Sequence, residues 1–562
     1  MSAGPDTAVR PRHRPPPERI REQEPGFWSR RLLIGLCIAL GLAEAALLEG
    51  FGLRSGLALA PQMAAPPPFG VFQDLRWVFV YGSGWLVFGG LMAALFVFRA
   101  SVVTACVLLA WPRDLRRPPL ARTFVNSLGF VALSVVFLTP AATAAFTTAV
   151  TTLWPFYALA FVFAVPVLLL FWYLAFPGWW RRLPPWRPFA WIVLSGVMLT
   201  LAGLAVDASP GWVTLVPAAL AGLFNALAWY AIADAVAHRI LRAERRHEPV
   251  ALRWISLATG GVVAAAAVGF GVAIWATTPE LPRVAATGRR DQPLIDAHGF
   301  RSHFDGTAKN QFGSGFVYQR FSYRGLSSSG KPLPYGPHAT YAPLRVLARR
   351  LGRQVQLLYR QTGKKVDLLG DSEGTLVEKY YLLTHPGAPV SKLVMTSPII
   401  HPARVRYPPF GSNGWGIASR FALERMASFV SALTFPVTVR TPLVLSLEHD
   451  APFLRDGMLC PVPGVAQAAF LPMTTALAEP PPLDRRIPTT DLPVLHGSVG
   501  TPQQEAEWLA LTGQDVPHFT AWRIATEIGR KAAAAWQVPS LPASLGWSGI
   551  PQPPSACPQP RG

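Results

Sequence analysis

The stretch VDLLGDSEGTLVEKYYLLT, residues 366–384, decides the fold of the second half of the chain. Its apolar start, 366–369, predicts a short buried strand, and residues 375–384 predict a helix. Gly370-Asp371-Ser372-Glu373-Gly374 joins the two. A serine held in a tight strand-to-helix turn needs neighbours without a Cβ atom, so Gly370 and Gly374 indicate a nucleophile elbow around Ser372.

Strands and helices alternate on both sides of this turn. Short strands are predicted at 293–297 and 315–323, and a longer helix at 341–362 has apolar residues at helical spacing and ends at Gly363. A further strand is predicted at 393–400. Strands that alternate with helices favour a mostly parallel sheet, so we expect an α/β domain here.

The segment from about 291 to 537 resembles the α/β-hydrolase superfamily. The resemblance rests on His298-Gly299 after the first strand, Tyr323-Arg324-Gly325 after the second, and the serine turn. It implies that Ser372 is the nucleophile and that the backbone N–H groups of Phe300 and Glu373 form an oxyanion hole. It also implies an acid and a histidine further along the chain.

The acid is expected at the end of a later strand. Residues 442–447 are predicted as that strand, and they run into Glu448-His449-Asp450. Asp450 matches the position of the family's acid just after the strand, and Glu448 could take its place only with a slip in the strand register. Asp456 and Asp491 are the alternatives.

The base is expected on a loop after the last strand. Residues 492–495 fit a strand and lead directly into His496, which matches the family's histidine, and a helix is predicted at 502–511. His518 is the next candidate, and His449 lies too near the acid. A Ser372-His496-Asp450 triad would form an acyl-enzyme that water hydrolyses, with no metal or organic cofactor.

A cap over the site is predicted at about 401–440. This segment is rich in aromatic residues, which suits a hydrophobic substrate or a cap core. Cys460 and Cys557 are the two cysteines of the second half, and an oxidising compartment would allow them to form a disulfide.

The first half of the chain has the composition of a membrane protein. The whole chain is 51% hydrophobic and 15% charged, and nearly all long apolar runs precede residue 276. A bilayer needs about 20 apolar residues in a helix. Seven segments meet that need, and they are 32–53, 77–98, 124–146, 152–176, 188–206, 212–236 and 252–276.

Cationic residues alternate between the ends of these segments. The tail before residue 32 has seven arginines, and 99–123, 177–187 and 237–253 have five, three and five cationic residues, while 54–76, 147–151 and 207–211 have two, none and none. Since Lys and Arg stay on the cytoplasmic side, we expect the N-terminus inside and the α/β domain outside. The run 100–111 is too short to cross alone and is expected to extend a helix or lie at the interface.

Two of the carboxylates within the predicted spans are notable. Glu44 lies inside the first and Asp234 near the end of the sixth. Intramembrane carboxylates are functional candidates. A helix-to-helix hydrogen bond by Glu44 and an interfacial position for Asp234 near Arg239 are the structural alternatives.

These observations predict a multi-pass α-helical membrane domain, 32–276, between a basic tail, 1–31, and an α/β-hydrolase domain, 277–550, which a polar tail, 551–562, follows. The net charge of +20 follows the membrane pattern, so nucleic acid is not expected as a partner. The expected function is a membrane-anchored serine esterase that acts on hydrophobic, lipid-like esters outside the cytoplasm. The alternatives are an inactive hydrolase-fold binding module and a lipid-transport bundle with an accessory hydrolase.

Overall fold

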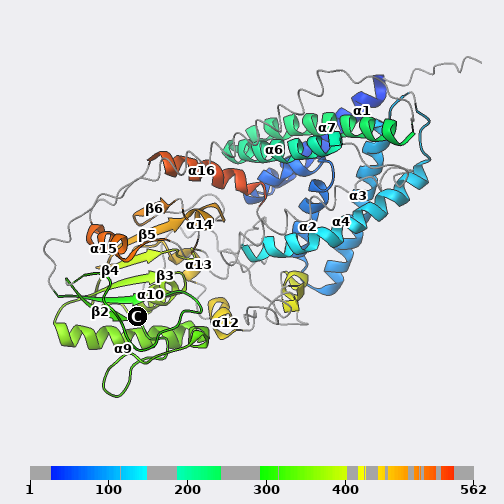
Figure 1. Cartoon of the computed structure of the whole chain (residues 1–562). Coiled ribbons are helices and arrows are strands. Elements are labelled where there is room, and N and C mark those ends of the chain that lie inside the picture. The colour runs from blue at the N-terminus through cyan, green and yellow to red at the C-terminus, as the bar shows by residue number, and fades with distance from the viewer. Residues whose placement is uncertain are drawn as a thin grey trace, which may run out of the picture.

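The computed structural model describes residues 27–113, 115–148, 186–241, 291–313, 315–400, 416–422, 424–425, 441–449, 453–478, 486–492, 494, 496, 499–513 and 520–536. A helical half precedes an α/β half along the chain, and Figure 1 shows the two as separate bodies that lie beside each other. The predicted spans 152–176 and 252–276 and the tail 551–562 lie outside the described residues.

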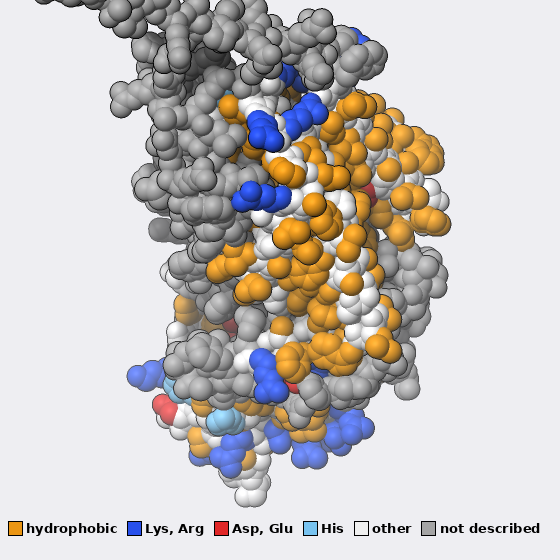
Figure 2. All heavy atoms as spheres, turned by 90° about the vertical axis from the view of Figure 1, so that its right-hand side faces the viewer, with side chains coloured by type: hydrophobic (Ala, Val, Ile, Leu, Met, Phe, Trp, Pro, Cys, Tyr) orange, Lys and Arg blue, Asp and Glu red, His pale blue; other side chains and the backbone are white. Residues whose placement is uncertain are grey.

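The helical half has five described helices that are long and apolar enough to cross a membrane, within α1, α3, α4, α6 and the segment Gly211–His238. Large apolar side chains such as Leu86, Leu120 and Leu220 are exposed on these helices, as lipid-facing residues would be. Figure 2 shows a broad apolar surface on this side of the molecule. The long helices are α1 (Phe27–Gly50), α3 (Trp85–Ala110), α4 (Leu120–Thr148), α6 (Trp186–Ala208) and α7 (Leu215–Leu241).

The predicted span 77–98 is wrong as a single helix. Helix α2 (Phe69–Tyr81) ends where Gly82 leaves the helical conformation, and α3 begins after the extended Gly84. A Cβ atom at Gly82 would lie 3.0 Å from the carbonyl oxygen of Val78. The run 100–111 therefore extends α3, as one of the two sequence interpretations held, and α1 begins inside the predicted tail.

Helix α2 is too short to span a membrane, and most of its residues are buried among the longer helices. A short helix, η1 (Arg54–Gln62), precedes it. Gln73 of α2 donates to both carboxylate oxygens of Glu44 at 2.6 Å, which is a hydrogen bond between helices of the expected kind. Asp74 pairs with Arg99 of α3. These contacts satisfy polar groups that would be costly to leave alone in an apolar interior.

Six parallel strands form the sheet of the second half, in the order β2-β1-β3-β4-β5-β6. The expected α/β architecture with a parallel sheet is confirmed. The strands are β1 (Gln292–Ala297), β2 (Phe316–Arg320), β3 (Val366–Asp371), β4 (Val390–Thr396), β5 (Ala466–Pro472) and β6 (Thr489–Leu492).

Helices cover both faces of the sheet. On one face α9 (Leu344–Thr362) and α10 (Glu373–Thr384) bury a core that includes Leu351 and Leu368. On the other, Trp508 of α15 (Pro502–Leu511) stacks on Phe470 of β5 at 4.1 Å. The remaining short elements are η4 (Gly211–Thr214), η5 (Pro337–Tyr341), α12 (Pro442–His449), α13 (Leu454–Gly457) and α14 (Met473–Ala478).

The last described helix, α16 (Thr520–Ala534), joins the two halves, since it contacts both α14 and α6. Just after it, the carbonyl of Ala535 accepts hydrogen bonds from Gln62 and Arg76. The indole of Trp536 donates to Thr200 of α6 at 2.9 Å. Specific polar contacts of residues 535–536 thus hold this end of the α/β half against the helical half.

The described part of the predicted cap, 416–422, packs on the break between α2 and α3. Ser419 donates to the carbonyl of Phe79 at 2.9 Å, and the Phe421 ring meets that of Trp85 edge-on at 5.7 Å. The rest of the predicted cap, apart from 424–425, lies outside the described residues.

Candidate active site

Ser372 lies between the end of β3 and the start of α10, in the turn that the sequence predicts. Its backbone has φ 50° and ψ −110°, a conformation that is strained for a residue with a side chain. The N–H of Ser372 donates to the carbonyl of Thr396 at 3.0 Å, and Thr375 donates to the carbonyl of Ser372 from both its N–H and its hydroxyl. Strain of this kind at a serine between strand and helix is typical of a nucleophile elbow.

The three glycines near this turn allow the chain segments to approach closely. A Cβ atom at Gly370 would lie 2.2 Å from Glu378, and one at Gly374 would lie 1.9 Å from the carbonyl oxygen of Ala297. A Cβ atom at Gly299 would lie 3.1 Å from the Cβ of Ser372. The residues after β1 are therefore directly beside the serine.

His496 contacts the serine. It follows β6, and its Nε2 is 2.9 Å from the Ser372 hydroxyl oxygen. The other ring nitrogen, Nδ1, is 3.4 Å from the Thr475 hydroxyl oxygen. When Nε2 accepts a hydrogen bond from the Ser372 hydroxyl, the neutral imidazole carries its hydrogen on Nδ1 and can donate a hydrogen bond to the Thr475 hydroxyl oxygen. Ser372 and His496 are 124 residues apart in sequence, and the fold brings them into hydrogen-bond distance.

Burial lowers the pKa of His496 to about 4, because an apolar surrounding disfavours the charged imidazolium. The imidazole is therefore neutral at pH 7. A neutral imidazole bonded to a serine hydroxyl can remove the proton of that hydroxyl during attack on a carbonyl carbon.

The predicted strand at 442–447 is wrong, because these residues form helix α12. Asp450, the predicted acid, lies outside the described residues. Strand β5 was not predicted from the sequence. The segment that follows it places Thr475 beside His496. The predicted last strand, 492–495, is displaced, since β6 is Thr489–Leu492.

The other candidate acids and bases have different positions. Asp491 is buried within β6. His518 lies outside the described residues, as do the side chains of Glu448, His449 and Asp456.

Phe300 and Glu373, whose N–H groups are the predicted oxyanion hole, lie on the two segments that meet at the serine. Glu373 is the first residue of α10, where backbone N–H groups have no partner within the helix. Phe300 follows Gly299, and its ring stacks on Tyr341 at 5.0 Å.

The side chain of Glu373 is buried, and neither of its carboxyl oxygens has a hydrogen-bond partner among the described residues. Burial raises the pKa of Glu373 well above its usual value. The uncharged form of the Glu373 carboxyl is therefore favoured, which weakens its contribution of negative charge beside the serine.

A group of carboxyls beside the serine was not predicted. Near the end of β1, Oδ2 of Asp296 is 2.9 Å from Nε2 of His298. The same oxygen accepts a hydrogen bond from the Tyr318 hydroxyl at 2.9 Å. Burial raises the pKa of Asp371 to about 6, and burial with the charges of Asp296 and Asp371 raises that of Glu505 to about 8. The signal in the sequence was Asp296 itself, a carboxylate inside a strand that is otherwise apolar.

Cys460 is disulfide-bonded in the structure, whereas Cys37 and Cys106 are free and buried. Cys557, the predicted partner of Cys460, lies outside the described residues, so the pairing stays a prediction.

Comparison of the chain with family models, with curated proteins and with solved structures gave no match.

Proposed function

We propose that the chain is a membrane-anchored serine hydrolase that cleaves hydrophobic carboxylic esters. The hydrogen bond between Ser372 and His496 carries the proposal, because it joins a strained serine at a strand-to-helix turn to a neutral imidazole. His496 would take the serine proton during attack and return it to the leaving alcohol. The N–H groups of Phe300 and Glu373 would bind the oxyanion, a contribution of about 3 kcal/mol for a single donor.

The proposed mechanism then passes through an acyl-enzyme. The ester C–O bond breaks as the Ser372 oxygen bonds to the acyl carbon, and a water activated by His496 releases the acid. Thr475 would hold the imidazole in the tautomer that accepts the serine proton. Asp450 remains the proposed acid of the site.

A hydrophobic acyl group suits the surroundings of the serine. Phe300, which follows Gly299, stacks on Tyr341, and burial raises the pKa of Glu373 well above its usual value, which favours its uncharged form. Residues 416–422 of the proposed cap contact the helical half at α2 and α3. A lipid-borne ester is therefore the substrate class that we favour.

We also propose that the α/β half faces away from the cytoplasm. Residues 535–536 contact Gln62 of η1 and Thr200 of α6, and η1 lies in the segment 54–76, which has few cationic residues. Cationic loops stay on the cytoplasmic side, which favours the opposite side for the α/β half.

The test uses the full-length protein in detergent micelles. A fluorophosphonate probe should label Ser372, as found by mass spectrometry of the labelled peptide, and p-nitrophenyl esters from acetyl to palmitoyl should be hydrolysed with a preference for longer chains. Wild-type protein that neither reacts with the probe nor hydrolyses any ester would exclude the proposal and favour a binding module of hydrolase fold.

The low pKa of His496 predicts a broad pH range of activity. Since the base is the neutral imidazole, kcat/KM should stay level as the pH falls from 7 to about 5 and should drop only near the pKa of about 4. A histidine in water would lose activity near pH 6.5. Intrinsic tryptophan fluorescence over the same range separates this effect from acid unfolding. A midpoint near 6.5 in folded protein would contradict the buried, neutral base.

A further inference from the structure

The second half of the chain has a large hollow away from the serine. Its volume is about 880 Å³, and it lies between α9, the loop 326–330 and the residues that follow α10. His385 to Ala388, on its rim, precede β4, whereas Ser372 follows the opposite end of β3. The hollow is therefore distinct from the candidate active site.

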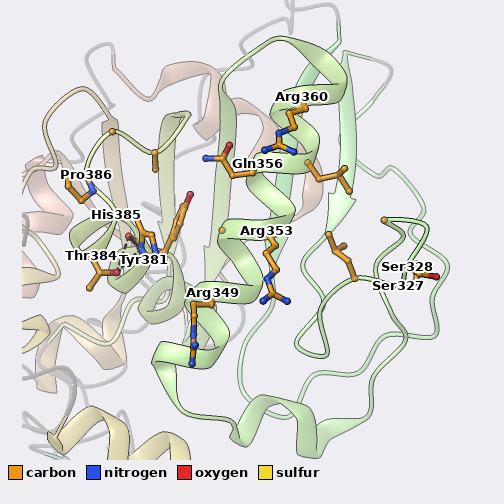
Figure 3. A pocket seen from close by; sticks show the side chains of 16 residues that line it. Ser327, Ser328, Arg349, Arg353, Gln356, Arg360, Tyr381, Thr384, His385 and Pro386 are labelled. Carbon is orange, nitrogen blue, oxygen red and sulfur yellow. Dashed lines mark hydrogen bonds between the residues drawn. The ribbon is translucent and has the colours of Figure 1, made fainter. Parts of the chain in front are cut away.

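Arginine side chains dominate one wall of this hollow. Arg349, Arg353 and Arg360 project from α9, and Gln356 lies between the last two (Figure 3). Ser327 and Ser328 lie on one side of these arginines, and Thr384 and His385 lie on the other. Spacings of four and seven residues keep the arginines on one face of the helix, over about 16 Å.

The positive charge of this hollow has no nearby compensation. No Asp or Glu is among the described residues that line it, and the sequence has none between Asp305 and Asp367, while the same segment has eleven Lys and Arg residues. Within the described part of the chain, no ion pair involves Arg349, Arg353 or Arg360. Figure 2 shows cationic side chains gathered at the lower end of the molecule. Helix α9 lies at this end in Figure 1.

Crowding of like charges is also seen beside the hollow. The pKa of Arg350 is lowered by burial and by the charges of Arg324 and Arg353. A bound anion would relieve this repulsion. The net charge of the chain is thus not only a consequence of membrane orientation, because part of it is concentrated on one face of α9.

We propose that this hollow, the α9 site, binds an extended anion with several phosphate groups. Guanidinium groups bind phosphate oxygens through two parallel hydrogen bonds, and hydroxyls and a histidine supply further donors. The length of the arginine row suits a chain of phosphates better than a single one. Among the described elements α9 packs closely against α10, α12, β1 and β3 and against no helix of the membrane half, which disfavours the lipid headgroups of the same membrane as the ligand.

The direct test measures binding of inorganic tripolyphosphate to the full-length protein by isothermal titration calorimetry. The triple variant Arg349→Gln/Arg353→Gln/Arg360→Gln should bind at least about tenfold more weakly, since it lacks the charge-assisted hydrogen bonds. The matched control is Lys309→Gln/Arg345→Gln/Lys365→Gln, which loses the same charge at exposed positions that do not line the hollow. It should bind within about twofold of wild type, because exposed charges act weakly through solvent. Thermal unfolding of each variant shows whether it is folded.

Several outcomes would overturn the proposal. Wild-type protein that does not bind tripolyphosphate excludes it. Equal losses in the two triple variants would indicate a diffuse charge effect and no site. Equal affinity for orthophosphate and tripolyphosphate would contradict an extended ligand. Binding to phosphatidylglycerol vesicles that depends on the three arginines, without binding of tripolyphosphate, would assign the site to a membrane surface. Each outcome is independent of whether Ser372 hydrolyses esters.

Discussion

Replacing Ser372 by alanine should abolish ester hydrolysis and labelling by a fluorophosphonate. The expected loss in kcat is about 10⁴-fold or more, because removing the nucleophile of a serine hydrolase leaves only binding and oxyanion stabilisation. The hydroxyl that would be lost is the one 2.9 Å from His496. Steady-state turnover of the best ester and the yield of labelled protein measure the effect.

Ser391→Ala is the matched control for this variant. Ser391 lies on β4, where its hydroxyl donates to Asp367 at 2.6 Å, and it is remote from the carboxyl ends of the strands. This variant should keep wild-type turnover and labelling. If Ser372→Ala retained turnover while folded, another group would be the nucleophile and the proposed mechanism would be wrong.

The turn around Ser372 could be predicted because its determinants are local. Gly370 and Gly374 flank the serine, an apolar strand precedes it and a helix follows. The αL conformation of Gly363 ends α9 where the sequence predicts a helix stop. Few residues other than glycine fit such positions, so the spacing of the glycines was enough to predict the turn and the end of the helix.

Strand β5, which leads to Thr475 beside His496, could not be predicted in the same way. Strand β5 has the sequence AQAAFLP, without a single β-branched residue, whereas the apolar segment 442–447 has the composition of a buried strand and forms helix α12. Tertiary packing decided both cases over local propensity. The sequence still predicted His496 as the base, because that prediction depends only on the loop after the last strand and not on β5.

The membrane half shows a similar limit. Hydropathy located the long helices, yet it merged part of α2 with α3, since both sides of the Gly82–Gly84 break are apolar. The hydrogen bonds of Glu44 with Gln73 and of Arg76 with the carbonyl of Ala535 depend on distant parts of the chain. Pairings at such sequence distances leave no periodic signal.

Replacing Gly374 by alanine should damage the fold and the site together. The added Cβ atom would lie 1.9 Å from the carbonyl oxygen and 2.7 Å from the carbonyl carbon of Ala297, which are backbone atoms of β1. Neither can move without disturbing the pairing of Ala297 with Gly370. Overpacking of this kind costs about 1–3 kcal/mol of unfolding free energy. The displaced turn would also lower turnover by about 10²-fold, since errors near 1 Å misalign a nucleophile.

Gly336→Ala separates this clash from the general effect of replacing a glycine. Gly336 has φ −95° and ψ 173°, which any residue can adopt, and no atom lies within 4 Å of the position that its Cβ atom would take. The melting temperature and turnover of the Gly336→Ala variant should match those of wild type, while the Gly374→Ala variant should melt several degrees lower and lose activity. Equal melting temperatures and turnover for both variants would show that β1 does not press against the serine turn. The proposed placement of the Phe300 N–H beside Ser372 would then fail too, because the same close approach of the two segments supports it.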